Sequence, residues 1–565
     1  MNKKKEGREM NRFIKIGMGV VITIFLLGNV TMPKAQAEDF SDWKILPDIE
    51  EGSYTLQGSD YVPPYAVNSA YEGSLRIAAG TDQGQRKFIL HLEGNHYEMG
   101  FQHGYLLAPI IEKTVDESLA EMLKFFFQDF PDETRNLLIN IASGIFTQSI
   151  GLFKDGIPTR YQNEIWGIVH GVAKRGYIND TDWAKQRLFN KIVALNIGPD
   201  LALAVFNWAA FGNSSSGYTV GANYLDGQNL PHMCDGFVVK GQGAAQQDKV
   251  IMGRNFMYTD KPWWKYGIII EYYPHNVREN GQDLHEINHV GVGMAGLIGI
   301  VSGMNAKGIG VGANLVSSSD SAKIDTIMDL ILNSGKFGMG AGITARKALA
   351  ENAELDMAIE MVEDAQVGAP WLFTIADGKG SNKGAAAVGK GASGKTTIRY
   401  MKDDTPPYLD TNLVHLEKSG YSDNLLVTSN FFMKREMYAE FIVGVSGYLR
   451  YNELLSRVEG AIEGGGVCFD SSEGGCGPIN IVLLSGETYQ IRPEYRYGTK
   501  LTNYLRYWDT NPKLYPPEHE KYSTNYPVRE LMATSVTLFD LTTTRMKTLY
   551  SKYDHDWVHY DLADN

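Results

Sequence analysis

The spacing of apolar residues divides the chain into a helix-rich first part and a strand-rich second part. From Tyr97 to about Ala210 the pattern is mostly helical, and its clearest stripe follows the i, i+3, i+4, i+7 spacing of one helix face: Leu119, Met122, Leu123 and Phe126. After about residue 234 the apolar runs become short, β-branched and punctuated by glycine. This pattern predicts antiparallel strands joined by tight connections. The runs are 237–240, 250–255, 267–273, 297–302 and 308–315.

The later part of the chain alternates between helix and strand patterns. One helical stretch is predicted at 345–365, where four residues share a face: Leu355, Ala358, Ile359 and Val362. A second helix is predicted near 448–462. Further strands are predicted at 371–375, 397–401, 425–428, 479–484, 535–541 and 546–550. Strands, then helices, then more strands predict an α+β fold in which helices cover the sheets.

The first 37 residues have the pattern of a secretory signal peptide. A basic front ending at Lys15 precedes an uncharged apolar run from Ile16 to Val30, and Ala35-Gln36-Ala37 has the small-x-small signature of a cleavage site. A retained membrane anchor is the alternative, since about 18 apolar residues just span a bilayer. We expect cleavage and a secreted or extracytoplasmic chain. No stable membrane insertion is expected afterwards, because no second apolar run of that length follows.

Composition narrows the classes of function. The 565 residues include 53 Lys plus Arg and 66 Asp plus Glu, which gives a formal net charge of −13. Proteins that bind nucleic acid normally carry a basic face, so no nucleic-acid partner is expected. An apolar content of 43% and a charged content of 21% are typical of a packed globular chain.

Three cysteines are too few for a disulfide scaffold, and their odd number leaves one thiol over. Cys468 and Cys476 lie eight residues apart in the glycine-rich segment 464–477. In an exported protein this favours a small disulfide over a zinc site, because no histidine lies nearby to complete the ligand set. Cys234 is then the unpaired thiol.

Three other sequence patterns could indicate an enzyme, a zinc-peptidase motif, a phosphate-binding loop and a serine-hydrolase elbow, and the sequence supports them less well. The segment from His285 through Glu286 to His289 matches the zincin pattern His-Glu-x-x-His, which requires both histidines on one helix face. Glycines at 281, 291 and 293 around the motif are typical of strands and loops, so a zinc peptidase remains an alternative only. The glycine-rich segment 335–342 lacks the end of a phosphate-binding loop, and no Gly-x-Ser-x-Gly elbow occurs. We expect neither a metal nor a cofactor.

Cys234 lies at the junction between the helix-rich and the strand-rich parts. An isolated cysteine is most often a buried core residue. Its position after the polar loop 213–227 and before a predicted strand favours a second interpretation. If the bond between Met233 and Cys234 were cut, Cys234 would carry both a thiol and a free α-amino group. That amino group has a pKa of about 7.7 to 8.0 in model peptides and can accept the thiol proton.

Six segments follow one another in the order typical of a known family. They are 94–104 (GNHYEMGFQHG), 234–237 (CDGF) with 253–256 (GRNF), 296–314, 427–431 (VTSNF), 446–451 and 535–540 (SVTLFD). Together they resemble the acyl-coenzyme A:6-aminopenicillanic acid acyltransferase family. Its members are self-processing N-terminal-nucleophile hydrolases related to choloylglycine hydrolase and penicillin V acylase.

The resemblance implies a fold and a division of the chain. The fold is a four-layer αββα N-terminal-nucleophile hydrolase sandwich with an N-terminal helical region. Autocatalytic cleavage between Met233 and Cys234 would expose Cys234 as the nucleophile. The chain would then consist of a signal peptide (1–37), a helix-rich pro-region or small chain (38–233) and a catalytic chain (234–565). The two processed chains are expected to remain associated.

The resemblance also implies roles for four residues around the nucleophile. Arg254 matches an arginine that lies close to the thiol and favours the thiolate. Arg450 matches an arginine that orients its neighbours or the substrate. Asn314 and Asn430 match positions whose side chains help to hold the oxyanion, and such donors typically contribute about 2.7 to 4 kcal/mol each to transition-state stabilisation.

One position departs from the family pattern. Members usually carry an aspartate that contacts the amino group of the nucleophile, and this chain has Met257 there. Asp235 and Asp260 are near in sequence, but neither is at the matching position. This departure keeps open the alternative of an inactive, surface-binding relative.

The sequence thus predicts an exported, autoproteolytic cysteine hydrolase or acyltransferase that cleaves a linear amide through a thioester acyl-enzyme. The substrate is expected to be a small N-acyl or lipid-like molecule. Four aromatic residues that follow the strand at 250–255 are predicted to line its pocket or to pack in the core: Phe256, Tyr258, Trp263 and Trp264. A lipid-ester hydrolase similar to phospholipase-B-like proteins and a zinc peptidase using His285 and His289 are the alternative enzymes.

Overall fold

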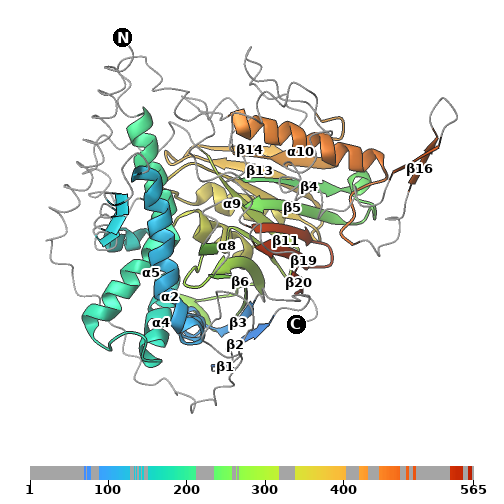
Figure 1. The fold of residues 1–565 in the computed structure, drawn as a ribbon. Helices are drawn as coiled ribbons and strands as arrows, with labels where there is room; N and C mark the ends of the chain where they lie inside the picture. Colours follow the sequence, from blue (N-terminus) through green and yellow to red (C-terminus); the bar gives the residue numbers. More distant parts are fainter. Residues whose placement is uncertain are drawn as a thin grey trace, which may run out of the picture.

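Two β-sheets packed face to face form the centre of the molecule in the computed structural model (Figure 1). The structure describes residues 69–70, 73–77, 88–127, 150–211, 234–256, 266–316, 337–402, 419–430, 445–470, 479–482, 488–491, 535–550 and 558–562, together with isolated residues between these ranges. The predicted signal peptide, Met233, Met257, Asp260 and Cys476 lie outside the described residues.

The larger sheet has ten strands. In spatial order they are β1 (Ser69–Ala70), β2 (Gly73–Ile77), β3 (Phe88–Gly94), β6 (Gly267–Pro274), β9 (His289–Met294), β10 (Ser302–Asn305), β11 (Ile309–Leu315), β12 (Trp371–Asp377), β13 (Gly384–Lys390) and β14 (Thr396–Tyr400). Neighbouring strands are antiparallel except β3 and β6, which pair in parallel.

The smaller sheet has six strands. In spatial order they are β15 (Leu425–Thr428), β4 (Cys234–Lys240), β5 (Val250–Phe256), β18 (Ser535–Asp540), β19 (Arg545–Tyr550) and β20 (Val558–Asp561), all antiparallel. Two short hairpins lie apart from both sheets: β7 (Val277–Glu279) with β8 (Gln282–Leu284), and β16 (Ile479–Val482) with β17 (Thr488–Ile491).

Helices cover the outer faces of both sheets. α8 (Ala341–Glu351) and α9 (Leu355–Asp364) pack on β10 to β13 of the larger sheet, and α10 (Val445–Glu463) packs on β4 and β15 of the smaller sheet. Between these layers, β11 contacts β4 and β5 across the interface of the two sheets. The predicted stripe of α9 is buried, as its spacing requires. This α+β, four-layer αββα sandwich confirms the predicted fold.

The alternation of side chains along β4 decides which way the first residue of that strand faces. Successive residues of a strand point to opposite faces of the sheet. Cys234 and Val238 belong to the core that the two sheets share, whereas Phe237 and Val239 belong to a second cluster that contains residues of α10. Cys234 therefore faces the inside of the sandwich, and Asp235 faces α10.

Three helices from the first part of the chain form a separate group beside the sheets: α2 (His96–Phe127), α4 (Thr159–Lys174) and α5 (Asp182–Phe211) (Figure 1). A short 3-10 helix, η1 (Gly151–Gly156), precedes α4 and contacts α5. α2 and α4 touch backbone to backbone, because a Cβ added to any of four glycines would lie 2.0 to 2.3 Å from a main-chain oxygen of the other helix. These glycines are Gly100, Gly104, Gly167 and Gly171.

The first part of the chain is helical from His96 onward, as predicted, and also contains strands before that residue. It contributes β1, β2 and β3 to the larger sheet, and β3 pairs directly with β6 of the second part. The only long helical stripe predicted there is confirmed, since Leu119, Met122 and Leu123 are buried in α2. The N-terminal region is therefore built into the sandwich as well as packed against it.

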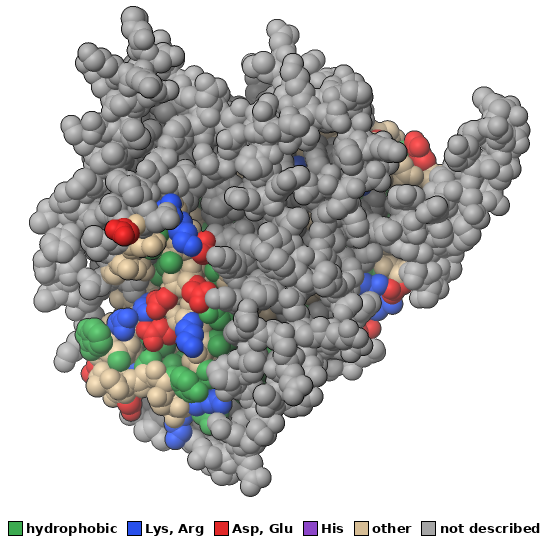
Figure 2. Space-filling view, in the orientation of Figure 1, with side chains coloured by type: hydrophobic (Ala, Val, Ile, Leu, Met, Phe, Trp, Pro, Cys, Tyr) green, Lys and Arg blue, Asp and Glu red, His purple; other side chains and the backbone are tan. Residues whose placement is uncertain are grey.

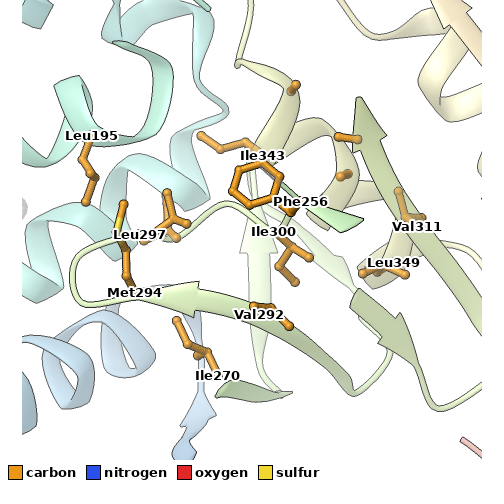
Figure 3. Packing of buried hydrophobic residues seen from close by; sticks show 14 of the residues in the cluster. Leu195, Phe256, Ile270, Val292, Met294, Leu297, Ile300, Val311, Ile343 and Leu349 are labelled. Atoms are coloured by element: carbon orange, nitrogen blue, oxygen red, sulfur yellow. The ribbon is translucent and has the colours of Figure 1, made fainter. Parts of the chain in front are cut away.

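The strand predicted at 297–302 is a loop, and only its last residue belongs to β10. Leu297, Ile298 and Ile300 are buried, and Figure 3 shows Leu297 near Leu195 of α5. Two backbone N–H groups of the loop are bonded by one side chain of α5 and not by a neighbouring strand. The Asn196 Oδ1 accepts the N–H groups of Ile298 (2.9 Å) and Gly299 (3.0 Å). Apolar content alone cannot distinguish such a buried loop from a strand.

The helical face seen in Figure 2 carries interspersed acidic and basic side chains. Lys191 of α5 lies 2.7 Å from Glu112 and 2.7 Å from Asp116 of α2, and so joins these two helices at the surface. Among the described residues, none of the helices combines the length and the hydrophobicity that a bilayer crossing requires.

Candidate functional site

Cys234 is the first residue of β4, a central strand of the smaller sheet with β15 on one side and β5 on the other. Its thiol is free, and the residue is only 1% exposed. Phe256 of β5 lies directly opposite in the register and shares its face of the sheet. The free thiol thus lies at the start of a strand in the middle of the smaller sheet, in the core that the two sheets share.

Asn430 and Arg450 hold the backbone of Cys234. The Asn430 Oδ1, just beyond β15, accepts a hydrogen bond from the backbone N–H of Cys234, and its Nδ2 donates to the Leu315 carbonyl at 2.7 Å. Arg450 of α10 donates to the Cys234 carbonyl at 3.2 Å and to the Asn430 Oδ1 at 2.9 Å. Both predicted residues therefore contact the backbone of Cys234, and Asn430 does so through its side-chain oxygen.

Arg254 lies between the two sheets on the other side of Cys234. Its guanidinium donates to the carbonyl of Asp235 at 3.1 Å and also to the carbonyls of Asn255 and Ala313. Gly312 of β11 makes room for it, because a Cβ there would lie 2.7 Å from the Cδ and Nε of Arg254. The side chain is 1% exposed, so it is a built-in part of the sheet interface.

Asn314 reaches the same region from β11 of the larger sheet. Its Nδ2 donates to the Ser429 carbonyl at 3.3 Å, next to Asn430, and its Oδ1 is buried with no hydrogen-bond partner in the part of the chain that the structure describes. A buried amide oxygen without a partner is costly in a finished core. Asn314 is therefore a side chain with hydrogen-bonding capacity to spare at the site.

The structure brings two further polar residues to the site. Asp235 is fully buried and accepts hydrogen bonds from Arg450 (2.9 Å) and from the Asn255 Nδ2 (2.5 Å). Asn255 lies opposite Asp235 in the register of β5 and β4. The sequence suggested Asp235 only as a possible replacement for an acid at position 257. Its position directly after Cys234, together with the predicted pairing of the two strands, could have placed both Asp235 and Asn255 at the site.

Aromatic side chains adjoin the site. Trp263 is buried and packs edge-on against Phe256, with ring centroids 5.1 Å apart, and its Nε1 has no hydrogen-bond partner among the described residues. Tyr258 and Trp264 lie outside the described residues. The pocket or core predicted from these aromatics therefore has one described wall, formed by Phe256 and Trp263.

The state of Cys468 is consistent with Cys234 as the free thiol. Cys468 is buried and disulfide-bonded. Its predicted partner, Cys476, lies outside the described residues, so the pairing itself stays a prediction.

The His285 to His289 segment does not have the geometry of a zincin site. Residues 285–288 form no helix, His285 is exposed, and His289 begins β9. Both ring nitrogens of His289 are engaged, with the Ile287 carbonyl at 2.7 Å and with the Nε of Arg346 at 3.3 Å. Burial, reinforced by Arg346, lowers the pKa of His289 to about 4. No cluster of three metal-ligating side chains occurs within the described part of the chain.

This segment belongs instead to a buried charge network that joins the N-terminal helices to the second part of the chain. Glu164 of α4 contacts Arg346 of α8 and His96 of α2, each at 2.6 Å. The other ring nitrogen of His96 lies 3.1 Å from Glu286, which also contacts Arg160 of α4 at 3.0 Å. All five side chains are at least 97% buried.

The charge states of the network follow from these contacts. Burial alone would lower the pKa of His96, but Glu286 and Glu164 outweigh it and raise that pKa above its ordinary value. Burial would raise the pKa of Glu164, but Arg346 and His96 hold it below the ordinary value. An imidazolium between two carboxylates, balanced by two guanidinium groups, is therefore the stable arrangement.

Comparisons with known proteins find distant likenesses. No family model matches the chain. An uncharacterized protein from Archaeoglobus fulgidus is 27% identical over 485 residues. The match covers 85% of this chain and 66% of that protein, so the chain spans slightly less than two thirds of its relative.

Three solved structures are similar to part of the chain. An ortholog of N-acylethanolamine-hydrolyzing acid amidase from Caenorhabditis elegans is 15% identical with a TM-score of 0.31, covering 58% of this chain and 100% of that one. A mutant conjugated bile acid hydrolase from Clostridium perfringens is 11% identical (TM-score 0.27; 59% and 93% covered). Penicillin V acylase from Agrobacterium tumefaciens is 14% identical (TM-score 0.28; 58% and 86% covered). Likenesses at this level assign no activity, so function is argued from the site residues.

Proposed function

We propose that this chain is an N-terminal-nucleophile amidohydrolase that activates itself by cutting the bond before Cys234 and then cleaves a linear amide of an N-acyl substrate. The observation that carries the proposal is the position of Cys234. It is a free thiol at the very start of a central strand, with its nitrogen bonded by Asn430 and its carbonyl bonded by Arg450.

Self-processing would proceed in two steps. The Cys234 Sγ attacks the carbonyl of Met233, and the acyl group moves from nitrogen to sulfur, which frees the α-amino group and forms a thioester. Water then hydrolyses the thioester and releases the Met233 carboxylate and the thiol. The contacts of Asn430 and Arg450 on either side of Cys234 support this step, since they hold the nucleophile's backbone while its preceding bond is broken.

Turnover would use the same atoms. The α-amino group accepts the thiol proton, and the thiolate attacks the amide carbonyl of the substrate. The leaving amine takes the proton back, and water, or an amine acceptor in an acyl transfer, releases the acyl group from the thioester. The Asn430 oxygen beside the nitrogen would orient the base. Asn314 is the proposed oxyanion donor, because its Nδ2 carries a second N–H besides the one that bonds the Ser429 carbonyl.

The gel and N-terminal sequence of the purified protein test this proposal directly. Two fragments are expected, and the larger should begin Cys-Asp-Gly-Phe. A single intact chain whose thiol also ignores iodoacetamide would contradict the proposal. The N-terminus of the smaller fragment tests the proposed export, because removal of residues 1–37 leaves a chain that begins at Glu38.

The acyl group of the substrate is proposed to be apolar, since the buried rings of Phe256 and Trp263 lie on the Cys234 side of the smaller sheet. Release of fatty acid from N-acyl amides, with no release from phospholipids, would support an amidohydrolase. The reverse result would instead support the lipid-ester hydrolase.

Replacement of Asn314 by alanine is expected to reduce hydrolysis of an N-acyl amide by about 10²- to 10³-fold, because an oxyanion donor is lost. The loss should appear in kcat with little change in KM, since the oxyanion exists only in the transition state. Asn305, a buried asparagine of β10 that bonds the carbonyls of Leu349 and Asn352, provides the matched control. Asn305→Ala should lower stability and leave kcat nearly unchanged. Equal kcat values for the two variants would contradict the proposed role of Asn314 as an oxyanion donor.

A further inference from the structure

We infer that Asp235 is a positioning residue that holds the Cys234 nucleophile through Arg450, from the opposite face of the sheet. The inference rests on the proposed function and assigns a role to a residue outside the predicted site. Its carboxylate touches no reacting atom, so its effect must pass through a neighbour.

The first step is the place of Asp235 in the strand. It directly follows Cys234 in β4, so its side chain points away from the thiol and toward α10. The side chain is fully buried. Its two carboxylate oxygens are divided between two neighbours, Oδ2 to the Nη1 of Arg450 at 2.9 Å and Oδ1 to the Nδ2 of Asn255 at 2.5 Å.

The second step is the reach of Arg450. The Nη1 atom that donates to Asp235 also donates to the Cys234 carbonyl at 3.2 Å, while Nη2 donates to the Asn430 Oδ1 at 2.9 Å. That oxygen in turn accepts the N–H of Cys234. One guanidinium therefore contacts the carbonyl of Cys234 directly and its nitrogen through Asn430, and Asp235 fixes the plane of that guanidinium.

The third step is charge. Two guanidinium groups bond the backbone at Cys234 in the described structure, Arg254 from β5 at the Asp235 carbonyl and Arg450 from α10 at the Cys234 carbonyl, and the Asp235 carboxylate pairs with Arg450. The adjoining segments of β15 (Leu425–Thr428) and β11 (Ile309–Leu315) contain no titratable side chain. Asp235 is therefore the carboxylate that offsets one of two guanidinium charges around the nucleophile. This chain has Met257 where related enzymes usually carry an acid, so an acid at 235 supplies the missing negative charge from a new position.

The test is Asp235→Asn, which keeps the shape of the side chain and removes its charge. Conversion of the precursor to two chains should slow about 10- to 100-fold, because the nucleophile is held less accurately. In matured protein, the pH midpoint of iodoacetamide alkylation at Cys234 should move to lower pH, since the uncompensated guanidinium favours the thiolate. A merely structural acid would not move that midpoint.

The matched control is Asp540→Asn. Asp540 is an equally buried acid of β18 in the same sheet, paired with Lys249 at 2.9 Å and with Arg545 at 3.1 Å. Its loss should lower thermal stability and leave both maturation and the alkylation midpoint unchanged.

A double variant makes the dependence on Arg450 measurable. If Asp235 acts through Arg450, Asp235→Asn combined with Arg450→Met should mature no more slowly than Arg450→Met alone. Multiplied effects, or an Asp235→Asn variant that behaves like Asp540→Asn, would overturn the inference. Either result would contradict the role of Asp235 only, provided that the unaltered chain is cut normally. If the unaltered chain is never cut, the proposed function itself is contradicted.

Discussion

Cys234→Ala is expected to leave the chain uncut and to reduce amide hydrolysis by about 10⁴-fold or more, the usual scale for loss of a catalytic nucleophile. No neighbouring group can replace it, because the same residue is proposed to supply both the thiol and the α-amino base. The fold should survive, since the change removes one atom from a packed strand. The measurements are a denaturing gel and acyl release from an N-acyl amide.

Val238→Ala is the control for this experiment. Val238 lies on the same face of β4 as Cys234 and is fully buried, so its truncation costs packing without touching the proposed chemistry. Val238→Ala should be cut normally. Hydrolysis by the unaltered chain should also persist in EDTA, whereas the zinc alternative requires its loss. A Cys234→Ala chain that is still cut at residue 233 would refute the proposed nucleophile.

Arg346→Met is expected to lower the free energy of unfolding by about 3 to 5 kcal/mol, the usual cost of removing one partner of a buried ion pair. Arg346 is fully buried, contacts Glu164 at 2.6 Å and lies over the Tyr272 ring at 3.8 Å. Methionine can fill the space but leaves the Glu164 carboxylate with less compensation. Urea unfolding in the Cys234→Ala background, where one uncut chain is expected, gives the measurement.

Lys347→Met, one residue further along α8, is the matched control. Its ion pair with Glu351 is an i, i+4 contact near the surface, so its loss should cost no more than about 0.5 kcal/mol. Equal urea midpoints for the two variants would show that the buried contact of Arg346 stabilises the fold no more than the surface ion pair of Lys347 does.

The same network gives stability a defined dependence on pH. The raised pKa of His96 means that its contribution is complete below the ordinary pKa and disappears as pH rises through the raised value. The lowered pKa values of Glu164 and Glu286 mean that their contributions are present above the ordinary pKa and disappear as pH falls through the lowered values. Arg346→Met removes the strongest favourable charge at Glu164 and brings its pKa back toward the ordinary value, so the loss of stability that Glu164 contributes in acid should become smaller.

Local patterns were enough to predict the layers of the fold. Runs with strand and helix spacing identified most elements of the second part. The candidate site residues came instead from the resemblance of several segments, in their order along the chain, to a known family. Arg254, Asn430 and Arg450 come from different parts of the chain, yet all three contact the backbone of Cys234 or of Asp235 beside it. Asn314 contacts the Ser429 carbonyl, next to Asn430.

The buried charge network was not predictable in the same way. His96 contacts residues 68 and 190 positions away, and no local spacing reports such pairings. The segment around His285 and His289 therefore suggested zinc, when Glu286 and His289 serve the contact between the two parts of the chain. The segment 94–104 resembled a family motif, and the structure gives a physical reason for two of its glycines, Gly100 and Gly104, which allow the close approach of α2 and α4.

The parallel pairing of β3 with β6 has a consequence for recovery after denaturation. These strands lie on opposite sides of the proposed cut, so the matured protein would complete one sheet with strands from two molecules. Refolding of the uncut Cys234→Ala chain would be a first-order process. Refolding of the matured form would require two separate polypeptides to associate, so the yield of refolded protein would fall on dilution. Once denatured, the matured protein would therefore recover its structure less efficiently than the uncut chain.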